Sequence, residues 1–98
     1  MTYRLIRAAS EELSEAISYY EAQKAGLGGE LRDEVEALID RIAANPLLWR
    51  ERRPGFRRAN CRIFPYYVMY CIRGEVVFIV AIAHGARRPG YWRERRIL

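Results

Sequence analysis

The stretch YVMYCIRGEVVFIVAIA at positions 67–83 decides the fold. Tyr67 to Ile72 is an apolar run rich in strand-forming residues, and Val76 to Ala83 is a second, nearly continuous one. Arg73-Gly74 between them supplies a tight turn. Because a strand without polar alternation is typical of one covered on both faces, we expect an antiparallel hairpin whose second strand lies at the centre of a sheet.

Two further strands are expected before this hairpin in the chain. Thr2 to Arg7 alternates and fits a short first strand. Before the hairpin the sequence repeats with period two, which predicts a half-buried strand with an arginine face. Its apolar positions are Ala59, Cys61 and Ile63, and its polar positions are Arg58, Asn60 and Arg62. The tripeptide Phe64-Pro65-Tyr66 then interrupts this alternation.

The segment between these strands has helical spacing. Ser10 is the expected N-cap of a first helix, with Glu11 and Glu12 in its first turn. The apolar stripe of that helix is Leu13, Ala16, Ile17 and Tyr20. A link containing Gly26, Gly28 and Gly29 precedes a second helix, whose apolar stripe is Leu31, Val35, Leu38, Ile39 and Ile42 and which ends at Asn45-Pro46. So short a link predicts an antiparallel helix hairpin.

These elements predict an α+β fold of order β-α-α-β-β-β, with the helix hairpin packed on one face of a small, twisted, mainly antiparallel sheet. Residues 1–98 suit a single domain. No apolar run reaches the roughly 18 residues of a membrane span, and the first residues lack a secretory signal, so we expect a cytoplasmic protein without membrane contact. Cys61 and Cys71 are then expected to be reduced structural thiols. Two cysteines and one histidine are too few for a metal site, and no cofactor is expected.

The charge of the chain is divided by segment. Met1 to Trp49 has 5 basic and 9 acidic residues, a net charge of −4, whereas Arg50 to Leu98 has 12 basic and 3 acidic residues, a net charge of +9. Every basic residue of the second half is arginine, whose planar fork suits phosphates and carboxylates. The alternative is general solubility in an arginine-biased composition. The segmental division favours an anionic or acidic partner.

Three local patterns in this order resemble the RelE/ParE toxin superfamily, also described as plasmid stabilisation proteins. They are Ala9 to Glu21 with its Tyr19-Tyr20 pair, Phe64-Pro65-Tyr66 followed by Val68-Met69-Tyr70, and Val80 to Gly85 followed by Arg87-Arg88-Pro89 and Trp92. The ending His84-Gly85-x-Arg87-Arg88-Pro89-x-x-Trp92 looks most like the ParE-type branch. The resemblance spans nearly the whole chain. It implies the toxin of a type II toxin–antitoxin system, held inactive by a cognate antitoxin.

The resemblance leaves the target open, because fold alone does not choose it. RelE-like relatives cut messenger RNA on the ribosome, and ParE-like relatives are associated with poisoning DNA gyrase. Cleavage through the 2′-hydroxyl needs a base, an acid and cations. Here the candidates are His84, Arg62, Arg87 and Tyr91, with Arg58 and Arg73 as further cations. His84 is alternatively a histidine that orders the following turn, which is the reading we favour because it has no visible catalytic partner.

RelE-like nucleases resemble one another in using clustered lysines and arginines with a tyrosine, or a glutamate with a terminal histidine and tyrosine. This chain departs from both patterns, since its basic half has no lysine. A gyrase inhibitor of ParE type is therefore the leading hypothesis. The alternatives are a ribosome-dependent messenger RNA endonuclease, with ribosome and messenger RNA as partners, and an inactive relative that only binds its antitoxin.

The expected target-binding residues interleave cations with aromatic side chains. They are Arg58, Arg62, Arg73, Arg87, Arg88, Tyr91, Trp92 and Arg95. Trp92 has an alternative position in the core against the sheet. Tyr19 lies about 100° from the apolar stripe of the first helix, so it should face outward. Its position alone fits either a single exposed aromatic side chain without a role or a contact with a partner. The resemblance implies a contact with the antitoxin, because antitoxins of this superfamily lay a helix and an extended segment over the helices and sheet of the toxin.

Overall fold

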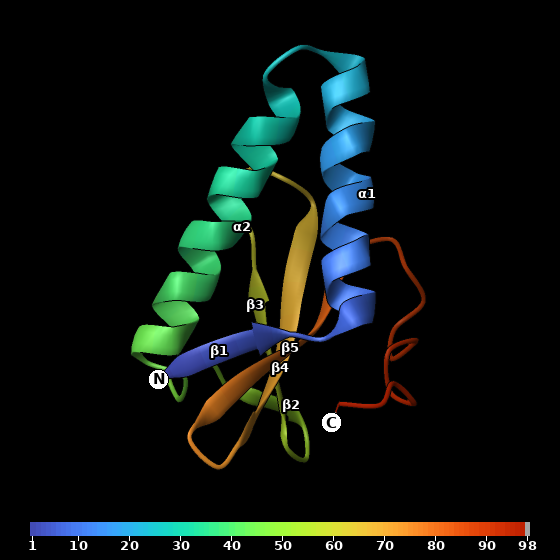
Figure 1. The fold of residues 1–98 in the computed structure, drawn as a ribbon. Coiled ribbons are helices and arrows are strands. Elements are labelled where there is room, and N and C mark those ends of the chain that lie inside the picture. The colour runs from blue at the N-terminus through green and yellow to red at the C-terminus, as the bar shows by residue number, and fades with distance from the viewer. Residues whose placement is uncertain (98) are drawn as a thin grey trace.

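The computed structural model of the protein describes residues 1–97. Its elements follow the expected order, with one additional short strand (Figure 1). They are β1 (Thr2–Leu5), α1 (Arg7–Gln23), α2 (Leu27–Ala44), β2 (Glu51–Arg53), β3 (Phe56–Asn60), β4 (Tyr66–Arg73) and β5 (Val76–His84). None of the helices in this part of the chain is long and apolar enough to cross a membrane.

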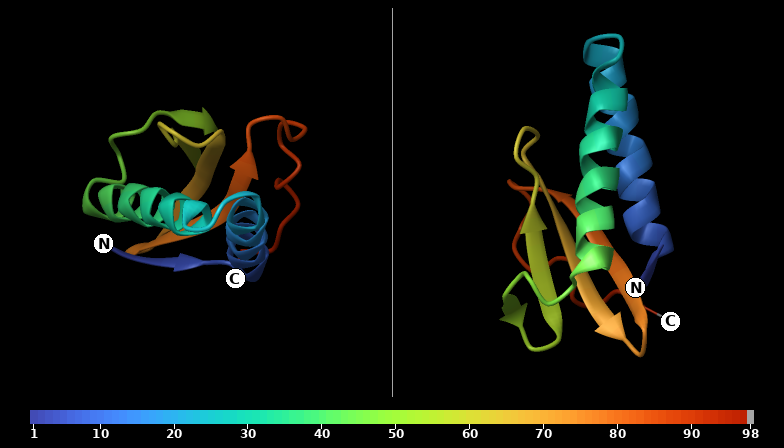
Figure 2. Two further views of the ribbon diagram at one scale, coloured as in Figure 1. Left: turned by 90° about the horizontal axis from the view of Figure 1, so that it is seen from above. Right: turned by 90° about the vertical axis from the view of Figure 1, so that its left-hand side faces the viewer.

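The strands form one mixed sheet of order β1-β5-β4-β3-β2, in which β1 runs parallel to β5 and the other neighbours are antiparallel. The helix hairpin of α1 and α2 covers one face of this sheet, and the C-terminal tail, residues 85–97, runs along another side of the molecule (Figure 2). The predicted α+β fold is therefore confirmed, and the strand that follows the Arg73-Gly74 turn is internal, with β1 on one side and β4 on the other.

The core between the helices and the sheet contains the residues that helical spacing predicted to be buried. All five predicted apolar positions of α2 are buried, and they cluster with Val68, Tyr70 and Ile79 of the sheet. Burying a side chain of this size contributes about 1.5–3 kcal/mol. The interior of the hairpin thus follows directly from the sequence pattern.

The glycine-containing link is shorter than expected. Gly26 has a φ of 90°, which favours glycine, and α2 begins at the next residue, so Gly28 and Gly29 lie inside the helix. A Cβ atom on Gly28 would lie 2.4 Å from the backbone oxygen of Ile17, whereas one on Gly29 would meet nothing nearer than 3.7 Å. Gly28 therefore allows the two helices to approach closely and does not break the second one.

The predicted start of α1 was wrong. The helix begins at Arg7, two residues after β1 ends at Leu5, and Ser10 lies inside it with its N–H bonded to the oxygen of Ile6. The chain passes directly from the sheet into the helix because the N–H of Ile6 still bonds Ile79 of β5 at 3.1 Å. Glu12 consequently lies beyond the first turn, where its carboxylate is free to reach other elements.

The strand predicted to run through Ile63 ends earlier, at Asn60. Beyond it the chain turns, and the carboxylate of Glu34 on α2 accepts hydrogen bonds from three successive N–H groups, those of Arg62, Ile63 and Phe64, at 2.7, 2.9 and 3.0 Å. This cap turns Phe64 into the core and leaves Ile63 82% exposed. The alternation at Ile63 was misleading, because a side chain of another element replaces the sheet as hydrogen-bonding partner.

The second face of the sheet is covered by the tail. A cluster on this face contains Tyr67, Met69 and Cys71 of β4 together with Trp92 of the tail. Cys61 packs against the other cluster, on the helix side, and both cysteines are free thiols. Burial, together with the nearby charge of Glu34, raises the pKa of Cys61 to about 12, which disfavours a reactive thiolate.

Candidate functional site

A single carboxylate on α1 holds the C-terminal tail in place. Glu12 accepts hydrogen bonds from both terminal nitrogens of Arg95, at 2.9 and 2.8 Å, and from the hydroxyl of Tyr91. It also accepts the N–H of Ile82 at 3.0 Å, and its side chain is only 13% exposed. The sequence analysis did not identify Glu12 as more than a charge in the first helical turn. Its role is set by contacts across 83 positions of the chain.

The cations of the tail stack on the same tyrosine. The guanidinium carbon of Arg87 lies 3.9 Å from the ring centroid of Tyr91, and that of Arg95 lies 4.9 Å from it. Arg87 also approaches Glu12 at 3.9 Å. Three of the predicted target-binding residues are thus brought together, and they are engaged within the chain. We name this group, which consists of Glu12, Arg87, Tyr91 and Arg95, the Glu12 cluster.

Hydrogen bonding fixes the protonation states in the Glu12 cluster. Burial raises the pKa of Glu12, but hydrogen bonds from Arg95, Tyr91 and Ile82 and the charge of Arg95 outweigh it, so the pKa lies below its usual value. Burial and the hydrogen bond to Glu12 hold the pKa of Tyr91 far above its usual value. The Tyr91 hydroxyl therefore keeps its proton near neutral pH and donates a hydrogen bond to Glu12.

His84 orders the turn that follows β5. Its Nδ1 atom accepts a hydrogen bond from the N–H of Ala86 at 3.0 Å, and its ring lies edge-on to Tyr66 with centroids 5.3 Å apart. This is the turn-ordering role that the sequence favoured. His84 nevertheless shares a pocket of about 160 Å³ with Arg87, Glu12 and Tyr66.

The other candidate for a nuclease site lies in a separate pocket. Arg62 lines a pocket of about 190 Å³ with Glu34 and Arg41, on the α2 side of the β3–β4 connection. The structure therefore brings His84 and Arg87 together but divides the four nuclease candidates, since Arg62 is elsewhere and the Tyr91 hydroxyl is bonded to Glu12.

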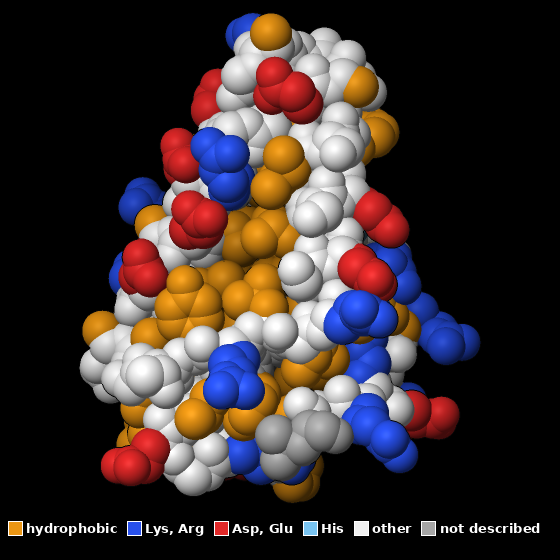
Figure 3. Space-filling view, viewed as in Figure 1, with side chains coloured by type: hydrophobic (Ala, Val, Ile, Leu, Met, Phe, Trp, Pro, Cys, Tyr) orange, Lys and Arg blue, Asp and Glu red, His pale blue; other side chains and the backbone are white. Residues whose placement is uncertain are grey.

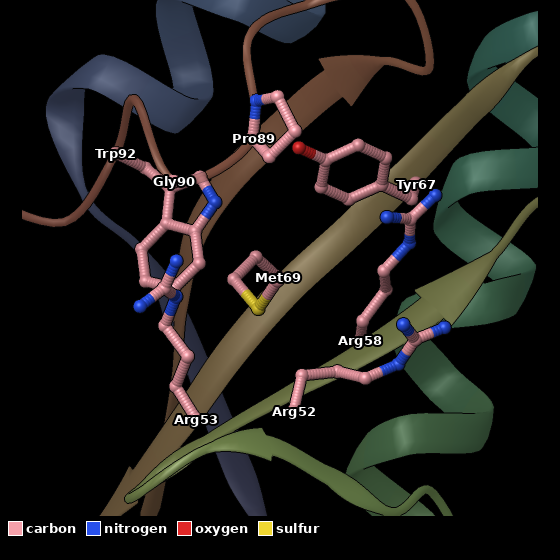
Figure 4. Close-up of a pocket in the computed structure, with 8 residues that line it drawn as sticks. All are labelled: Arg52, Arg53, Arg58, Tyr67, Met69, Pro89, Gly90 and Trp92. Carbon is pink, nitrogen blue, oxygen red and sulfur yellow. The ribbon is translucent and has the colours of Figure 1, made fainter.

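A different set of arginines gathers on the sheet face that the tail partly covers. Arg58 of β3 lines a pocket of about 250 Å³ with Arg52 and Arg53 of β2 (Figure 4). The remaining lining residues are Tyr67, Met69, Pro89, Gly90 and Trp92. Sequence reasoning identified Arg58 and Trp92 but missed the other two arginines, because β2 is too short to give a strand pattern. We name this the arginine pocket.

Trp92 belongs to the core. Its side chain is 2% exposed, and its ring lies 4.9 Å from that of Phe56. Of the two positions considered for Trp92, the structure has the one against the sheet, so its ring face is not available to a partner. Its place in the proposed target surface is limited to the wall of the arginine pocket.

Two further predicted target residues lie apart from both groups. Arg73 is exposed at the turn between β4 and β5, and Arg88 is exposed in the tail. The eight predicted target-binding residues thus divide into the arginine pocket, the Glu12 cluster, the separate pocket of Arg62 and two isolated surface arginines.

Comparison with known proteins assigns the chain to a family. The sequence model of the family described as the ParE toxin of the type II toxin–antitoxin system parDE matches residues 3–89. This chain belongs to the ParE toxin family. The resemblance stated from the local patterns is therefore confirmed, and membership of the ParE family implies an antitoxin partner.

The fold is also found in a solved relative. A chain of the "Chromosomal ParDE TA system from P. aeruginosa" superposes with a TM-score of 0.66 at 18% identity, over 86% of this ParE-family chain and 95% of the other. At this identity the similarity shows the shared fold. No curated protein matches this sequence.

One more feature of this ParE-family toxin lies on the helix hairpin. Tyr19 is 60% exposed, as its helical position predicted, and its ring lies edge-on to Tyr20 at 5.2 Å. On the face that carries the helices, hydrophobic side chains form a strip between α1 and α2 that is flanked by charged side chains (Figure 3). An apolar strip of this kind is typical of a protein-binding surface.

Proposed function

We propose that this ParE-family toxin inhibits growth by acting on DNA gyrase and is neutralised when a cognate antitoxin binds it. The single observation that supports gyrase over the ribosome is the hydrogen bond from Tyr91 to Glu12. A nuclease of the expected kind needs a free proton acceptor near its cations. In this chain the Tyr91 hydroxyl donates a hydrogen bond to Glu12, and the Nδ1 atom of His84 already accepts a backbone N–H, so neither is a free proton acceptor.

The antitoxin is proposed to bind the helix hairpin. The apolar strip between α1 and α2 and the exposed ring of Tyr19 suit the apolar face of an amphipathic segment. The excess of arginine in the second half of the chain favours acidic residues elsewhere in that segment. Binding to the folded chain alone raises its stability by mass action.

The target surface is proposed to include the arginine pocket and the exposed Arg88. Arg87 and Arg95 are less suited to contact a target directly, because their guanidinium groups are held by Glu12 and Tyr91. Substituting them disturbs the fold of the tail as well as any target contact. Arg88 is therefore the cleaner test of the tail surface.

A ribosome-dependent messenger RNA endonuclease is the second candidate, because His84 and Arg87 share one pocket. Expression of the wild-type chain in growing cells separates the two. For a gyrase inhibitor we expect arrested growth, a DNA-damage response and no codon-phased messenger RNA cleavage, with His84→Ala reducing toxicity only as far as it disturbs folding. Codon-phased cleavage that a well-folded His84→Ala or Arg62→Ala variant abolishes would establish the nuclease. Unchanged growth would identify an inactive relative that only binds its antitoxin.

A further inference from the structure

The arginine pocket concentrates positive charge without a carboxylate to offset it. Arg52, Arg53 and Arg58 form no ion pair with any acidic side chain of residues 1–97, whereas Arg95 is paired with Glu12 at 2.8 Å. Three like charges around a pocket of about 250 Å³ repel one another. An anion bound there converts this repulsion into attraction.

A second, independent observation in the same pocket points to an acceptor. The indole Nε1 of Trp92 is buried and has no hydrogen-bond partner among residues 1–97. Figure 4 shows this nitrogen on the side of the ring that faces the pocket interior, towards Met69 and Pro89. A buried donor without a partner destabilises the fold, and an oxygen atom bound in the pocket would remove that cost.

The arrangement of the donors selects the type of anion. Figure 4 shows the Arg53 guanidinium beside Trp92 and the guanidinium groups of Arg52 and Arg58 on the other side of Met69. A carboxylate presents two oxygens in one plane, whereas a backbone phosphodiester presents two unesterified and two ester oxygens in a tetrahedral arrangement around phosphorus. Guanidinium groups that arrive from two sides, with an indole N–H between them, therefore match a phosphate better than a carboxylate.

The aromatic side chains of the pocket exclude recognition by base stacking. The ring of Tyr67 is 3% exposed and is covered by the Arg58 guanidinium at 3.9 Å, and Trp92 is 2% exposed. Stacking of nucleic-acid bases needs accessible aromatic faces. A nucleic acid therefore meets this pocket through its backbone, which carries no sequence information.

We propose that the arginine pocket binds a backbone phosphate of DNA. The choice of DNA as the nucleic acid rests on the proposed function, because DNA is the substrate of gyrase. The site holds the toxin against its target's DNA by charge and shape, and this binding does not depend on base sequence.

The test measures binding of the full chain to a fluorescently labelled DNA duplex by anisotropy over a range of salt concentrations. Arg52 and Arg53 are exposed, so the double variant R52A/R53A should fold. The matched control is R4A/R7A, which removes the same charge from two exposed residues at β1 and the start of α1. Thermal unfolding checks the fold of both variants.

We expect R52A/R53A to weaken duplex binding at least about tenfold and to lower the salt slope by up to about 2, since each phosphate contact contributes about 0.9. The control should bind within about twofold of the wild type, and two duplexes of different sequence should bind equally. R58A should weaken binding in the same direction as R52A/R53A.

The site would be overturned if both double variants lost the same affinity, or if the wild type did not bind DNA. It would also be overturned if a hexaglutamate peptide bound in the pocket and duplex DNA did not, since an acidic protein segment would then be the occupant. Gyrase-linked DNA breaks that persist in a folded R52A/R53A chain without DNA affinity would overturn the proposal that this site holds the toxin against its target's DNA, and would leave the proposed function intact. DNA binding by the pocket without such breaks would reject the proposed function and leave the site.

Discussion

The carboxylate of Glu12, near the start of α1, holds the guanidinium of Arg95, near the end of the chain, through two hydrogen bonds of 2.9 and 2.8 Å. The pair also completes the edge of β5. Since β1 pairs with β5 only as far as Ile79, the backbone beyond it needs other partners, and Glu12 accepts the N–H of Ile82 while Arg95 donates to the oxygen of Val80. One ion pair thus fixes the tail and satisfies an exposed strand edge.

Substitution of Glu12 should release the tail. For Glu12→Ala we expect a loss of roughly 2–3 kcal/mol in the free energy of unfolding, because hydrogen bonds to charged groups contribute about 1.5–3 kcal/mol each and the partners of Glu12 are left unpaired. Urea denaturation measures the loss, and hydrogen exchange should show faster exchange at Ile82. Glu11→Ala, at an exposed neighbouring position, should change stability by less than about 0.5 kcal/mol. Equal stability of the two variants would contradict the role of Glu12.

Two hydrogen-bonded glutamates, Glu12 and Glu34, should make the fold sensitive to acid. For Glu34, burial raises the pKa, but hydrogen bonds from the N–H groups of Ile63, Phe64 and Arg62 outweigh it, so the pKa is lowered, as it is for Glu12. A carboxyl whose pKa is lower in the folded than in the unfolded chain stabilises the fold fully above its unfolded value of about 4.3. That stabilisation is lost as the pH falls through the lower folded value.

Thermal unfolding between pH 7 and pH 3 measures this effect. The wild type should lose stability steeply below about pH 4.3, and the double variant E12Q/E34Q should show a shallower dependence because it lacks the two linked protonations. If the stability of the wild type and that of the variant fell in parallel with pH, the stabilising role of both carboxylates would be contradicted.

The close approach of α1 and α2 should depend on Gly28. Gly28→Ala places a methyl group 2.4 Å from the Ile17 oxygen, a contact with backbone that only a shift of the helices can relieve, so we expect a loss of at least about 2 kcal/mol. Gly29→Ala meets nothing nearer than 3.7 Å and should stabilise the chain by up to about 1 kcal/mol, since alanine favours helix. Denaturant unfolding compares the two, and a loss at Gly29 as large as that at Gly28 would refute the packing argument.

Tyr19 should matter for the antitoxin and not for the fold. Tyr19→Ala truncates a side chain that is 60% exposed, so the unfolding free energy of the isolated chain should change by less than about 0.5 kcal/mol. Affinity for the cognate antitoxin should fall at least about fivefold, because buried tyrosines often contribute more than about 1 kcal/mol at interfaces. Leu47→Ala, 67% exposed after α2, is the matched control and should leave affinity unchanged. Isothermal titration with the antitoxin measures both, and unaltered binding by Tyr19→Ala would place the antitoxin elsewhere.

The elements of the fold could be predicted where one local pattern decides them. The apolar stripe of α2 and the run from Val76 to Ala83 report burial directly, and both lie as expected. The errors occur at Ser10, Gly28 and Ile63, where distant groups determine the local structure. The pairing of Ile6 with β5 starts α1 early, close packing against Ile17 accommodates Gly28 inside α2, and Glu34 ends β3 early. No local pattern contains that information.

For the candidate site, the sequence predicted only the excess of positive charge and not which residues lie together. The excess of arginine predicts an anionic partner, but it does not show which arginines are already neutralised. The only acids of the second half are Glu51, Glu75 and Glu94, and the carboxylate that binds Arg95 comes from the first half. Conversely, the arginine pocket depends on β2, a strand of three residues that gives no period. Tertiary contacts thus decide which charges remain for a partner.

The most direct test of the central claim uses purified components: DNA gyrase, supercoiled plasmid and the full-length chain, with and without its antitoxin. If the chain acts on gyrase, linear plasmid covalently attached to gyrase should accumulate with increasing toxin, and the antitoxin should abolish it. The His84→Ala variant should retain this effect if it is folded. Plasmid that stays uncut at every toxin concentration, while the same preparation cleaves messenger RNA in step with codons on translating ribosomes, would contradict the account.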